Sequence, residues 1–203
     1  MEMNSGNSLN FKKVCLKNGK VVKLCCTSVA SDCIILAYNE DKQVGKCSFS
    51  FSEASMRKWS KREVLQYSKQ KGRRDLKEIY EVNRVYKNGW EYRRLFDEEP
   101  AEGFHKDLQK ECTINLIQVE SWDFYKVGLG SAMFTEMQNM AIDEGCKRIT
   151  AWYCPVGQFA DGAQSFYIRN GFTFKKDRSG FNITAIKELP KGEGKKDCSK
   201  AKE

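Results

Sequence analysis

Two glycines separated by one residue, placed where an apolar run ends and a helix begins, can create a binding site for phosphate. Such a turn stands at Tyr125–Ser131, which reads YKVGLGS. Gly128 and Gly130 let the main chain approach a ligand closely, and the amides near Leu129, Gly130 and Ser131 point out of the helix start. Free amides at this position attract anions. The turn therefore predicts a phosphorylated ligand, and an ordinary strand-to-helix turn is the alternative.

Two widespread phosphate-binding motifs do not fit this turn. The dinucleotide fingerprint Gly-x-Gly-x-x-Gly requires a third glycine where Met133 stands. A P-loop requires Gly-Lys followed by Ser or Thr, and the sequence does not contain that triplet. The turn is therefore neither of these two nucleotide sites.

The spacing of apolar residues predicts the elements that position the turn. A β-branched strand over Thr113–Val119 precedes it. A helix over Ser131–Glu144 follows, and Gly145 ends that helix. Further along, we expect a strand at Arg148–Cys154 ended by Pro155, a helix at Ala160–Arg169 ended by Asn170-Gly171, and strands at Phe172–Lys176 and Asn182–Leu189.

The N-terminal half predicts mainly strands. Lys20–Leu24 is a short strand candidate, and Cys33–Tyr38 and Gln43–Phe51 form a hairpin across a polar turn. A helix is expected over Glu53–Lys71. The pattern Ser60-x-x-Glu63 inside it is a capping box, so Ser60 is an alternative start for that helix.

Asn88-Gly89 predicts a second hairpin, because this pair tolerates positive φ at both central positions of a tight turn. Its arms are Val82–Lys87 and Trp90–Phe96. Alternate residues of the second arm share a face, which carries Trp90, Tyr92, Arg94 and Phe96. Such side chains can stack on nucleic-acid bases, or they can form the core of a small insert.

Taken in order, these elements resemble the GNAT-type N-acetyltransferases, enzymes that move an acetyl group from acetyl-CoA to an amine. Ile114–Val119 is similar to the family's fourth strand, and Tyr125–Ser131 is similar to its pyrophosphate loop. Ala163–Phe172 is similar to the helix that ends at the cofactor thiol. The resemblance covers about Thr113–Phe174.

The sequence departs from the family pattern at three places. Tyr125 stands where the loop usually carries Gln or Arg. Ala160 stands where the last helix often begins with Asn. The third and fourth strand candidates are separated by an unusually long insert at about 52–111, which is expected to border the acceptor site.

The resemblance implies an α/β (α+β) fold, with a mixed, mainly antiparallel central sheet flanked by helices. Ile35–Tyr38 and Gln43–Lys46 are similar to the second and third strands, and the Asn88-Gly89 hairpin is the alternative for that pair. The cofactor is expected in the cleft where the fourth and fifth strands diverge. Residues 1–189 are then a single domain, and the lysine-rich residues 190–203 are a disordered tail.

The same resemblance implies acetyl-CoA as co-substrate and suggests which residues act. Coenzyme A would contact Val119, Tyr125, Lys126, Val127, Gly128, Leu129, Gly130 and Ser131. Glu120 is the expected base, since an alkylammonium with a pKa of about 10 must lose a proton; Asp123 or a relayed water is the alternative. Tyr167 is the expected acid, because a phenol with a pKa of about 10 is protonated at neutral pH. A main-chain amide near Val119 would meet the oxyanion. A solvated carboxylate and a packed ring are the ordinary alternatives for Glu120 and Tyr167.

The positive charge of the chain indicates what kind of acceptor it could bind. The net charge is +8, and Arg57–Arg94 carries 13 basic and 5 acidic residues. A solvated basic face is the simpler explanation of this balance, and the alternative is an acceptor amine with acidic surroundings, or one carried on nucleic acid. Two other functions stay open: a nucleic-acid-binding module that uses the basic aromatic insert, and a CoA-binding scaffold without catalysis. We expect a monomer or a homodimer.

The cysteine spacing indicates whether the protein has a metal site, and the length of its apolar runs indicates whether it enters a membrane. The sequence has nine cysteines without a Cys-x-x-Cys pair and one histidine, His105. These spacings do not predict a zinc site, so we expect free thiols, some of them in the core, and no metal. No apolar run approaches the roughly 20 residues that span a bilayer, and Met1–Phe11 lacks the apolar core of a signal peptide. A cytoplasmic protein that does not enter the membrane is therefore expected.

Overall fold

The computed structural model describes residues 11–29, 32–87, 89–97, 99, 109–153, 160–176 and 183–190. The strands are β1 (Phe11–Cys15), β2 (Val21–Val29), β3 (Asp32–Asn39), β4 (Lys42–Lys58), β5 (Tyr80–Tyr86), β6 (Glu91–Phe96), β7 (Gln109–Val119), β8 (Arg148–Tyr153), β9 (Thr173–Lys176) and β10 (Ile183–Glu188). The helices are α1 (Lys61–Lys71), the short 3₁₀ helix η1 (Trp122–Phe124), α2 (Leu129–Asp143) and α3 (Ala160–Arg169).

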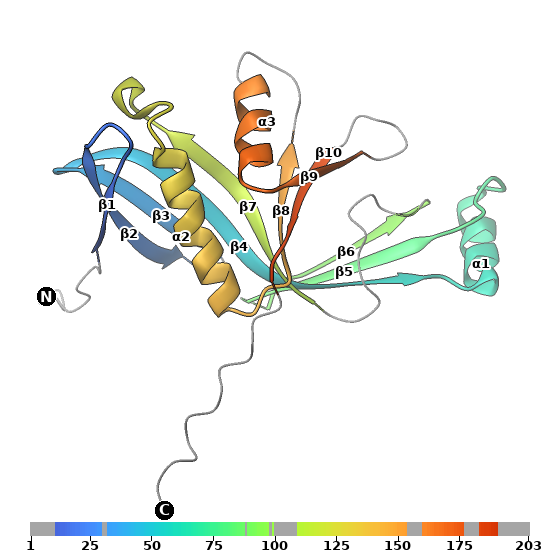
Figure 1. Cartoon of the computed structure of the whole chain (residues 1–203). Helices are drawn as coiled ribbons and strands as arrows, with labels where there is room; N and C mark the ends of the chain where they lie inside the picture. Colours follow the sequence, from blue (N-terminus) through green and yellow to red (C-terminus); the bar gives the residue numbers. More distant parts are fainter. Residues whose placement is uncertain are drawn as a thin grey trace, which may run out of the picture.

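The strands form one sheet in the order β1-β2-β3-β4-β7-β8-β10-β9, from which β5 and β6 branch at β4 (Figure 1). Neighbouring strands are antiparallel except β7 and β8, which are parallel. The expected fold class, a mixed and mainly antiparallel sheet flanked by helices, is confirmed. In the described part of the chain, every helix is too short or too polar to cross a membrane.

The N-terminal strands show which of two hairpins pairs with β7. β3 and β4 form the hairpin expected at Cys33–Phe51, and β4 pairs with β7 from Gly45↔Val119 onward. The Asn88-Gly89 hairpin instead joins β5 and β6, which pair from Tyr80↔Phe96 to Val85↔Glu91. The strands that lead into β7 are therefore β3 and β4, and Asn88 itself lies outside the described residues.

The helix expected over Glu53–Lys71 is wrong in its first part. β4 continues as a strand to Lys58, because β5 pairs with it from Ser52↔Tyr86 to Lys58↔Tyr80. Alternate residues Ala54 and Met56 are buried there, which is the period of a strand and not of a helix. The helix begins only after Ser60, the alternative start.

The capping box at Ser60 forms as the sequence predicts. The Ser60 hydroxyl accepts a hydrogen bond from the Glu63 amide at 3.4 Å, and the Glu63 carboxylate accepts one from the Ser60 amide at 2.8 Å. Gly72 closes α1 in the left-handed conformation. We call β4 residues Ser52–Lys58, α1, β5 and β6 the wing; it extends away from the other strands, with α1 at its end (Figure 1).

The main core lies between one face of the sheet and the helices α2 and α3. α2 packs on β3, β4 and β7, and its Phe134, Met133 and Met137 are almost fully buried. α3 lies on the same side, since Phe166 meets the Phe134 ring at 6.0 Å. Four thiols serve as small core residues, as expected: Cys25, Cys47, Cys112 and Cys146.

The opposite face, called here the second face, carries polar side chains. Along β8, Ile149 and Ala151 belong to the core, so the intervening Thr150 and the following Trp152 point to the second face. Thr113 of β7 lies beside Thr150, with the two hydroxyl oxygens 3.2 Å apart.

β7 and β8 separate part of the way along their length. Their parallel pairing runs from Glu111↔Arg148 to Ile114↔Ala151 and then stops, while β7 continues to Val119. At the same level the register between β4 and β7 shifts, because Ser48 pairs with Leu116 and Phe49 with Ile114. Asn115 is thus an extra residue, a β-bulge of the kind that redirects the main chain.

Candidate functional site

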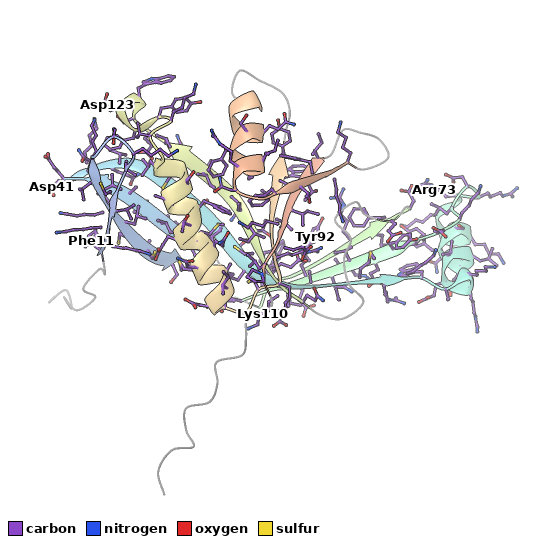
Figure 2. The ribbon with its side chains drawn as sticks, viewed as in Figure 1. Phe11, Asp41, Arg73, Tyr92, Lys110 and Asp123 are labelled. Atoms are coloured by element: carbon purple, nitrogen blue, oxygen red, sulfur yellow. The ribbon has the colours of Figure 1, made fainter. Side chains whose placement is uncertain are left out.

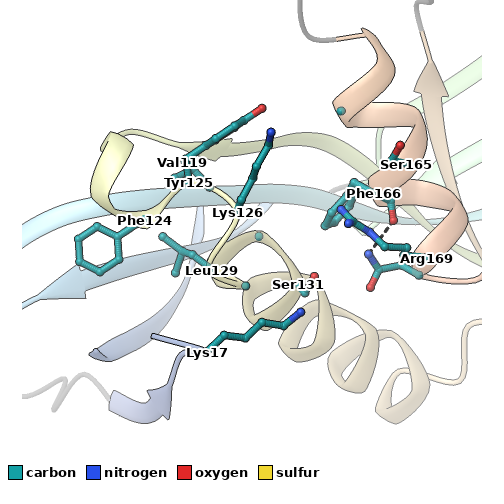
Figure 3. A pocket seen from close by; sticks show the side chains of 14 residues that line it. Lys17, Val119, Phe124, Tyr125, Lys126, Leu129, Ser131, Ser165, Phe166 and Arg169 are labelled. Carbon is teal, nitrogen blue, oxygen red and sulfur yellow. Dashed lines mark hydrogen bonds between the residues drawn. The ribbon is translucent and has the colours of Figure 1, made fainter. Parts of the chain in front are cut away.

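A cavity of about 810 Å³ lies beside the separated part of β7, between the start of α2 and helix α3 (Figure 3). It is lined by Lys17, Val119, Phe124, Tyr125, Lys126, Gly128, Leu129, Gly130, Ser131, Gly162, Ser165, Phe166, Arg169 and Asn170. The Gly-x-Gly turn that the sequence singled out therefore forms one wall of this cavity.

The turn has the conformation that a helix-start anion site requires. Lys126 and Gly128 both adopt positive φ, of 61° and 98°. Gly128 is the N-cap of α2 and provides no side-chain cap. The first intrahelical bond runs from the Ala132 amide to the Gly128 carbonyl at 2.9 Å, so the amides of Leu129, Gly130 and Ser131 precede the hydrogen-bonded ladder. α2 starts two residues before the expected Ser131, which places Gly130 inside its first turn.

Three glycines around the cavity lie within ordinary contact distance of a neighbouring side chain. A Cβ on Gly130 would lie 3.5 Å from the Phe166 ring, and one on Gly128 would lie 3.7 Å from the Lys17 side chain. A Cβ on Gly162 would lie 3.4 Å from the Tyr125 hydroxyl oxygen, so the turn and α3 meet at this rim. These contacts place the turn and α3 side by side at the rim of the cavity.

Three cations reach the cavity from three different elements (Figure 3). Lys126 belongs to the turn, and Arg169 lies in the last turn of α3. Lys17 comes from the turn between β1 and β2, where its amide donates to the Val127 carbonyl at 3.1 Å. Together with the α2 amides, these cations could hold an anionic group in the cavity.

Lys17, Arg169 and the α3 residues of the cavity were missed by sequence reasoning. The signal for Lys17 was only the run of five lysines in 11–30, which does not distinguish one lysine from another. Lys17 reaches the cavity because β1 pairs with β2 and their turn lies against the loop before α2. Such a long-range contact has no local sequence signature.

All but one of the expected cofactor contacts line the cavity. The exception is Val127, whose side chain packs against the main core and whose carbonyl accepts the Lys17 amide. Val119 lines the cavity at the end of β7. The structure thus brings together Val119, Tyr125, Lys126 and residues 128–131.

The two expected bases lie outside the residues that line the cavity. Glu120 is exposed, its amide donates to the Val44 carbonyl at 2.9 Å, and its carboxylate accepts a hydrogen bond from the Gln43 side chain at 2.7 Å. Asp123 is exposed on η1. A proton relay through water would be needed to connect either carboxylate with the cavity, so the role of Glu120 stays a prediction.

Tyr167 is not among the residues that line the cavity; it follows the lining residue Phe166 in α3 and lies in an aromatic cluster. Its ring centroid is 5.1 Å from that of Phe172 and 6.3 Å from those of Tyr153 and Phe174. Burial raises the pKa of the Tyr167 phenol to about 12, and the Cys47 thiol adds to the shift. The hydroxyl therefore keeps its proton across the physiological range, as a proton donor must.

Metal ligands were not expected, and within the described ranges no three His, Cys, Asp or Glu side chains are grouped to hold an ion. His105 lies outside those ranges.

Comparison with known proteins relates the chain to others through structure alone. No protein-family model matches the sequence, and no curated protein matches it. The GNAT domain of S. lividans PAT superposes with a TM-score of 0.52 at 10% identity, over 88% of this chain and 97% of that one.

Two other solved structures align less well. A PaiA N-acetyltransferase from Thermoplasma acidophilum, in complex with coenzyme A, gives a TM-score of 0.42 at 9% identity, over 78% of this chain and 62% of that one. A GNAT acetyltransferase from Elizabethkingia anophelis with acetyl-CoA bound gives 0.41 at 12% identity, over 78% of this chain and 77% of that one. The S. lividans superposition, together with the strand order and the separation of β7 from β8, shows that this chain has the fold of the GNAT-type N-acetyltransferases.

Proposed function

We propose that this protein is an N-acetyltransferase that moves an acetyl group from acetyl-CoA to a primary amine. One observation carries the proposal. The unpartnered amides at the start of α2 share a cavity with Lys17, Lys126 and Arg169, and this cavity lies beside the separated part of β7.

The diphosphate of coenzyme A fits the turn on grounds of charge and geometry. The amides of Leu129, Gly130 and Ser131 supply donors that need no side chain, and the α2 dipole favours negative charge at that end. Lys17, Lys126 and Arg169 supply positive charge for the same group and for a further phosphate.

The edge of β7 that no longer pairs with β8 can bind the rest of the cofactor. One edge of β7 pairs with β4 up to Gly45↔Val119, while its pairing with β8 ends at Ile114. Main-chain groups between Asn115 and Val119 can therefore bond the amides of an extended cofactor arm. At about 3.3 Å per residue, this stretch is long enough to bring a thioester from the phosphate site to the point where the strands part.

Catalysis then requires a neutral amine, a polarised carbonyl and a proton for the thiolate. A main-chain amide of the free β7 edge polarises the thioester carbonyl. Glu120, with Asp123 or a water relay as alternative, accepts the proton of the amine. Tyr167 donates to the thiolate. Its high pKa does not disqualify it, because a leaving thiolate that is desolvated at the site also gains basicity.

The first test separates cofactor binding from turnover. Acetyl-CoA should raise the melting temperature, since a ligand at 100 times its Kd stabilises the folded state by about 2.7 kcal/mol. Thiol release in the presence of amines should then follow. No thermal shift with acetyl-CoA would refute the proposal, and a shift without turnover on any amine would favour a scaffold that binds CoA without catalysis.

Nucleic-acid binding by the wing is less well supported, because acids within the wing neutralise much of its charge. Glu81, almost fully buried, forms ion pairs with Arg57 and Arg93 at 2.8 and 2.6 Å, and accepts the Trp59 indole N–H at 2.7 Å. Arg73 pairs with Asp75 at 2.8 Å.

A further inference from the structure

A second hollow, of about 290 Å³, lies on the second face of the sheet, across the sheet from α2 and α3. Its residues are Val82, Arg84, Tyr86, Trp90, Tyr92, Arg94, Phe96, Thr113, Thr150, Ala151, Trp152 and Thr184. One wall is the β5–β6 hairpin and the other is the sheet at β7, β8 and β10. Tyr92 lies between the hairpin and these strands (Figure 2). We call this hollow the wing groove.

The wing groove opens at the point where β7 and β8 part. Thr113 and Thr150 belong to the second-last paired rung of these strands, and Ala151 belongs to the last one, Ile114↔Ala151. The cofactor cavity lies on the other side of the sheet, beside the continuation of β7. A thioester that reaches the end of the paired rungs from the cavity would therefore meet an amine that enters from the groove.

The walls of the groove suit a planar ring. Tyr86, Trp90 and Tyr92 form a row, with centroids 5.1 and 6.1 Å apart. Trp152 lines the opposite wall with 76% of its surface exposed, and Trp90 is 57% exposed. Large aromatic side chains exposed on both walls of one hollow are unlike the scattered apolar residues of an ordinary surface, and they mark a binding site.

The charge of the groove suits an anion. Two of its lining residues are arginines and none is Asp or Glu. Arg94 lies over the Phe96 ring at 4.8 Å, with its guanidinium in contact with solvent. Arg84 is held near Glu111 at 3.6 Å. Arginine in a fixed position binds carboxylate or phosphate in two-point fashion, whereas a polycationic amine would be repelled.

We propose that the wing groove is the acceptor site, and that the acceptor is a small primary amine that carries both a planar ring and an anionic group. This inference rests on the proposed acetyl transfer. The amine nitrogen attacks the thioester carbonyl carbon, the carbon–sulfur bond breaks, the amine proton leaves to the base, and the thiolate takes a proton. The products are an amide and the free thiol of coenzyme A.

The experiment uses the full chain and amines matched for ring and charge. Tryptophan and O-phosphotyrosine carry both features, tryptamine and tyramine carry only the ring, leucine and O-phosphoserine carry only the anion, and spermidine carries neither. Thiol release gives kcat/KM for each amine, and calorimetry without acetyl-CoA gives Kd. We expect kcat/KM for tryptophan and O-phosphotyrosine to exceed that of their matched partners by at least about tenfold, which corresponds to about 1.4 kcal/mol.

Two variants connect the preference with the groove. Trp152→Ala should remove most of the advantage of ring-bearing amines, and Arg94→Gln should remove most of the advantage of anionic ones. Both side chains are exposed, so the fold should persist. The matched controls are Leu65→Ala and Arg62→Gln, at exposed positions of α1 at the far end of the wing. They should change neither the preference for ring-bearing amines nor the preference for anionic ones.

The outcomes distinguish this inference from the function on which it rests. If acetyl-CoA binds and amines release its thiol, but without this preference or with spermidine as the best acceptor, the acceptor class is wrong while acetyl transfer stands. If the ring-bearing anions bind and the variants weaken them although acetyl-CoA gives no thermal shift, the groove stands and acetyl transfer fails. Displacement of these amines by a single-stranded oligonucleotide at tighter affinity would overturn the small-molecule acceptor.

Discussion

Glu111 and Arg148 form a buried ion pair across the first rung of the parallel β7–β8 pairing, with side chains only 1% and 3% exposed. Arg84 of the wing approaches the same carboxylate at 3.6 Å. One acidic side chain thus joins three strands, β5, β7 and β8, at the closed end of the region where β7 and β8 later separate. This cluster therefore connects the wing with strands that form the other wall of the wing groove.

Replacing Glu111 by Gln should destabilise the protein strongly. The change removes the negative charge that Glu111 supplies to the buried Arg148 guanidinium and to the adjacent Arg84, and breaking a buried ion pair typically costs about 3–5 kcal/mol. Urea unfolding measures the loss. The matched control is Glu91→Gln on the exposed surface of β6, which should change the unfolding free energy by less than about 0.5 kcal/mol. Equal stability of the two variants would show that the ion pair does not hold the strands together.

Replacing Gly128 by Val should abolish the acetyl-CoA thermal shift. The residue has a φ of 98°, which a β-branched side chain adopts only with strain, and its main chain faces the cavity. Gly145→Val is the matched control, because Gly145 has a φ of 76° just after the other end of the same helix. Both variants should lose stability, and only Gly128→Val should lose binding. Retained binding in Gly128→Val would separate the turn from the cofactor.

Lys17→Gln and Arg169→Gln should each weaken acetyl-CoA binding by roughly fivefold to tenfold, as expected for one charged hydrogen bond of about 1 kcal/mol. The slope of log Kd against log salt should also decrease, because each variant removes a cation that meets a phosphate. Lys13→Gln on the exposed side of β1 serves as control. Binding that is unchanged in Lys17→Gln would exclude the β1–β2 turn from the site.

Tyr167→Phe should lower kcat and leave the Kd of acetyl-CoA unchanged, because the ring keeps its packing and only the hydroxyl is lost. The wild-type rate should increase with pH as the amine loses its proton. Since burial raises the phenol pKa to about 12, this rate should not decrease at any pH under about 11. A decrease in rate near pH 10 would mean that a less buried group is the acid.

Glu120→Gln should lower the rate without affecting cofactor binding, and an unchanged rate would leave Asp123 as the remaining candidate base.

The unfolding free energy should fall as the pH rises above about 9. Burial raises the pKa of the Cys47 and Cys146 thiols from 9.0 to about 12, and that of Tyr167 from 10.0 to about 12. Groups with a raised folded-state pKa stabilise the fold fully below their unfolded pKa, and this contribution is lost as the pH approaches the folded value. Denaturation at pH 7, 9 and 10.5 measures the slope. Cys146→Ala should flatten it, and an unchanged slope would show that this thiol ionises as easily in the folded state.

Local patterns were sufficient where a few neighbouring residues decide the structure. The capping box of Ser60 and Glu63, the helix at Ala160–Arg169 and the glycine turn before α2 all depend on contacts within one or two turns of chain, and the structure has each of them. The pattern failed for Glu53–Lys58 because pairing with β5, from Glu53↔Val85 to Lys58↔Tyr80, outweighed the local helical preference.

The sequence by itself determined the position of the glycine turn and of the strand and helix that flank it, because apolar spacing and glycine act through the local main chain, while the resemblance to the GNAT-type N-acetyltransferases implied the fold class. Only the tertiary structure decided that Lys17 and Arg169 join that turn, that Glu120 lies outside the cavity, and that Trp90 and Trp152 line one groove. Those arrangements come from strand order and from the separation of β7 and β8. Both depend on contacts between residues far apart in the chain, for which no short stretch of sequence carries a signal.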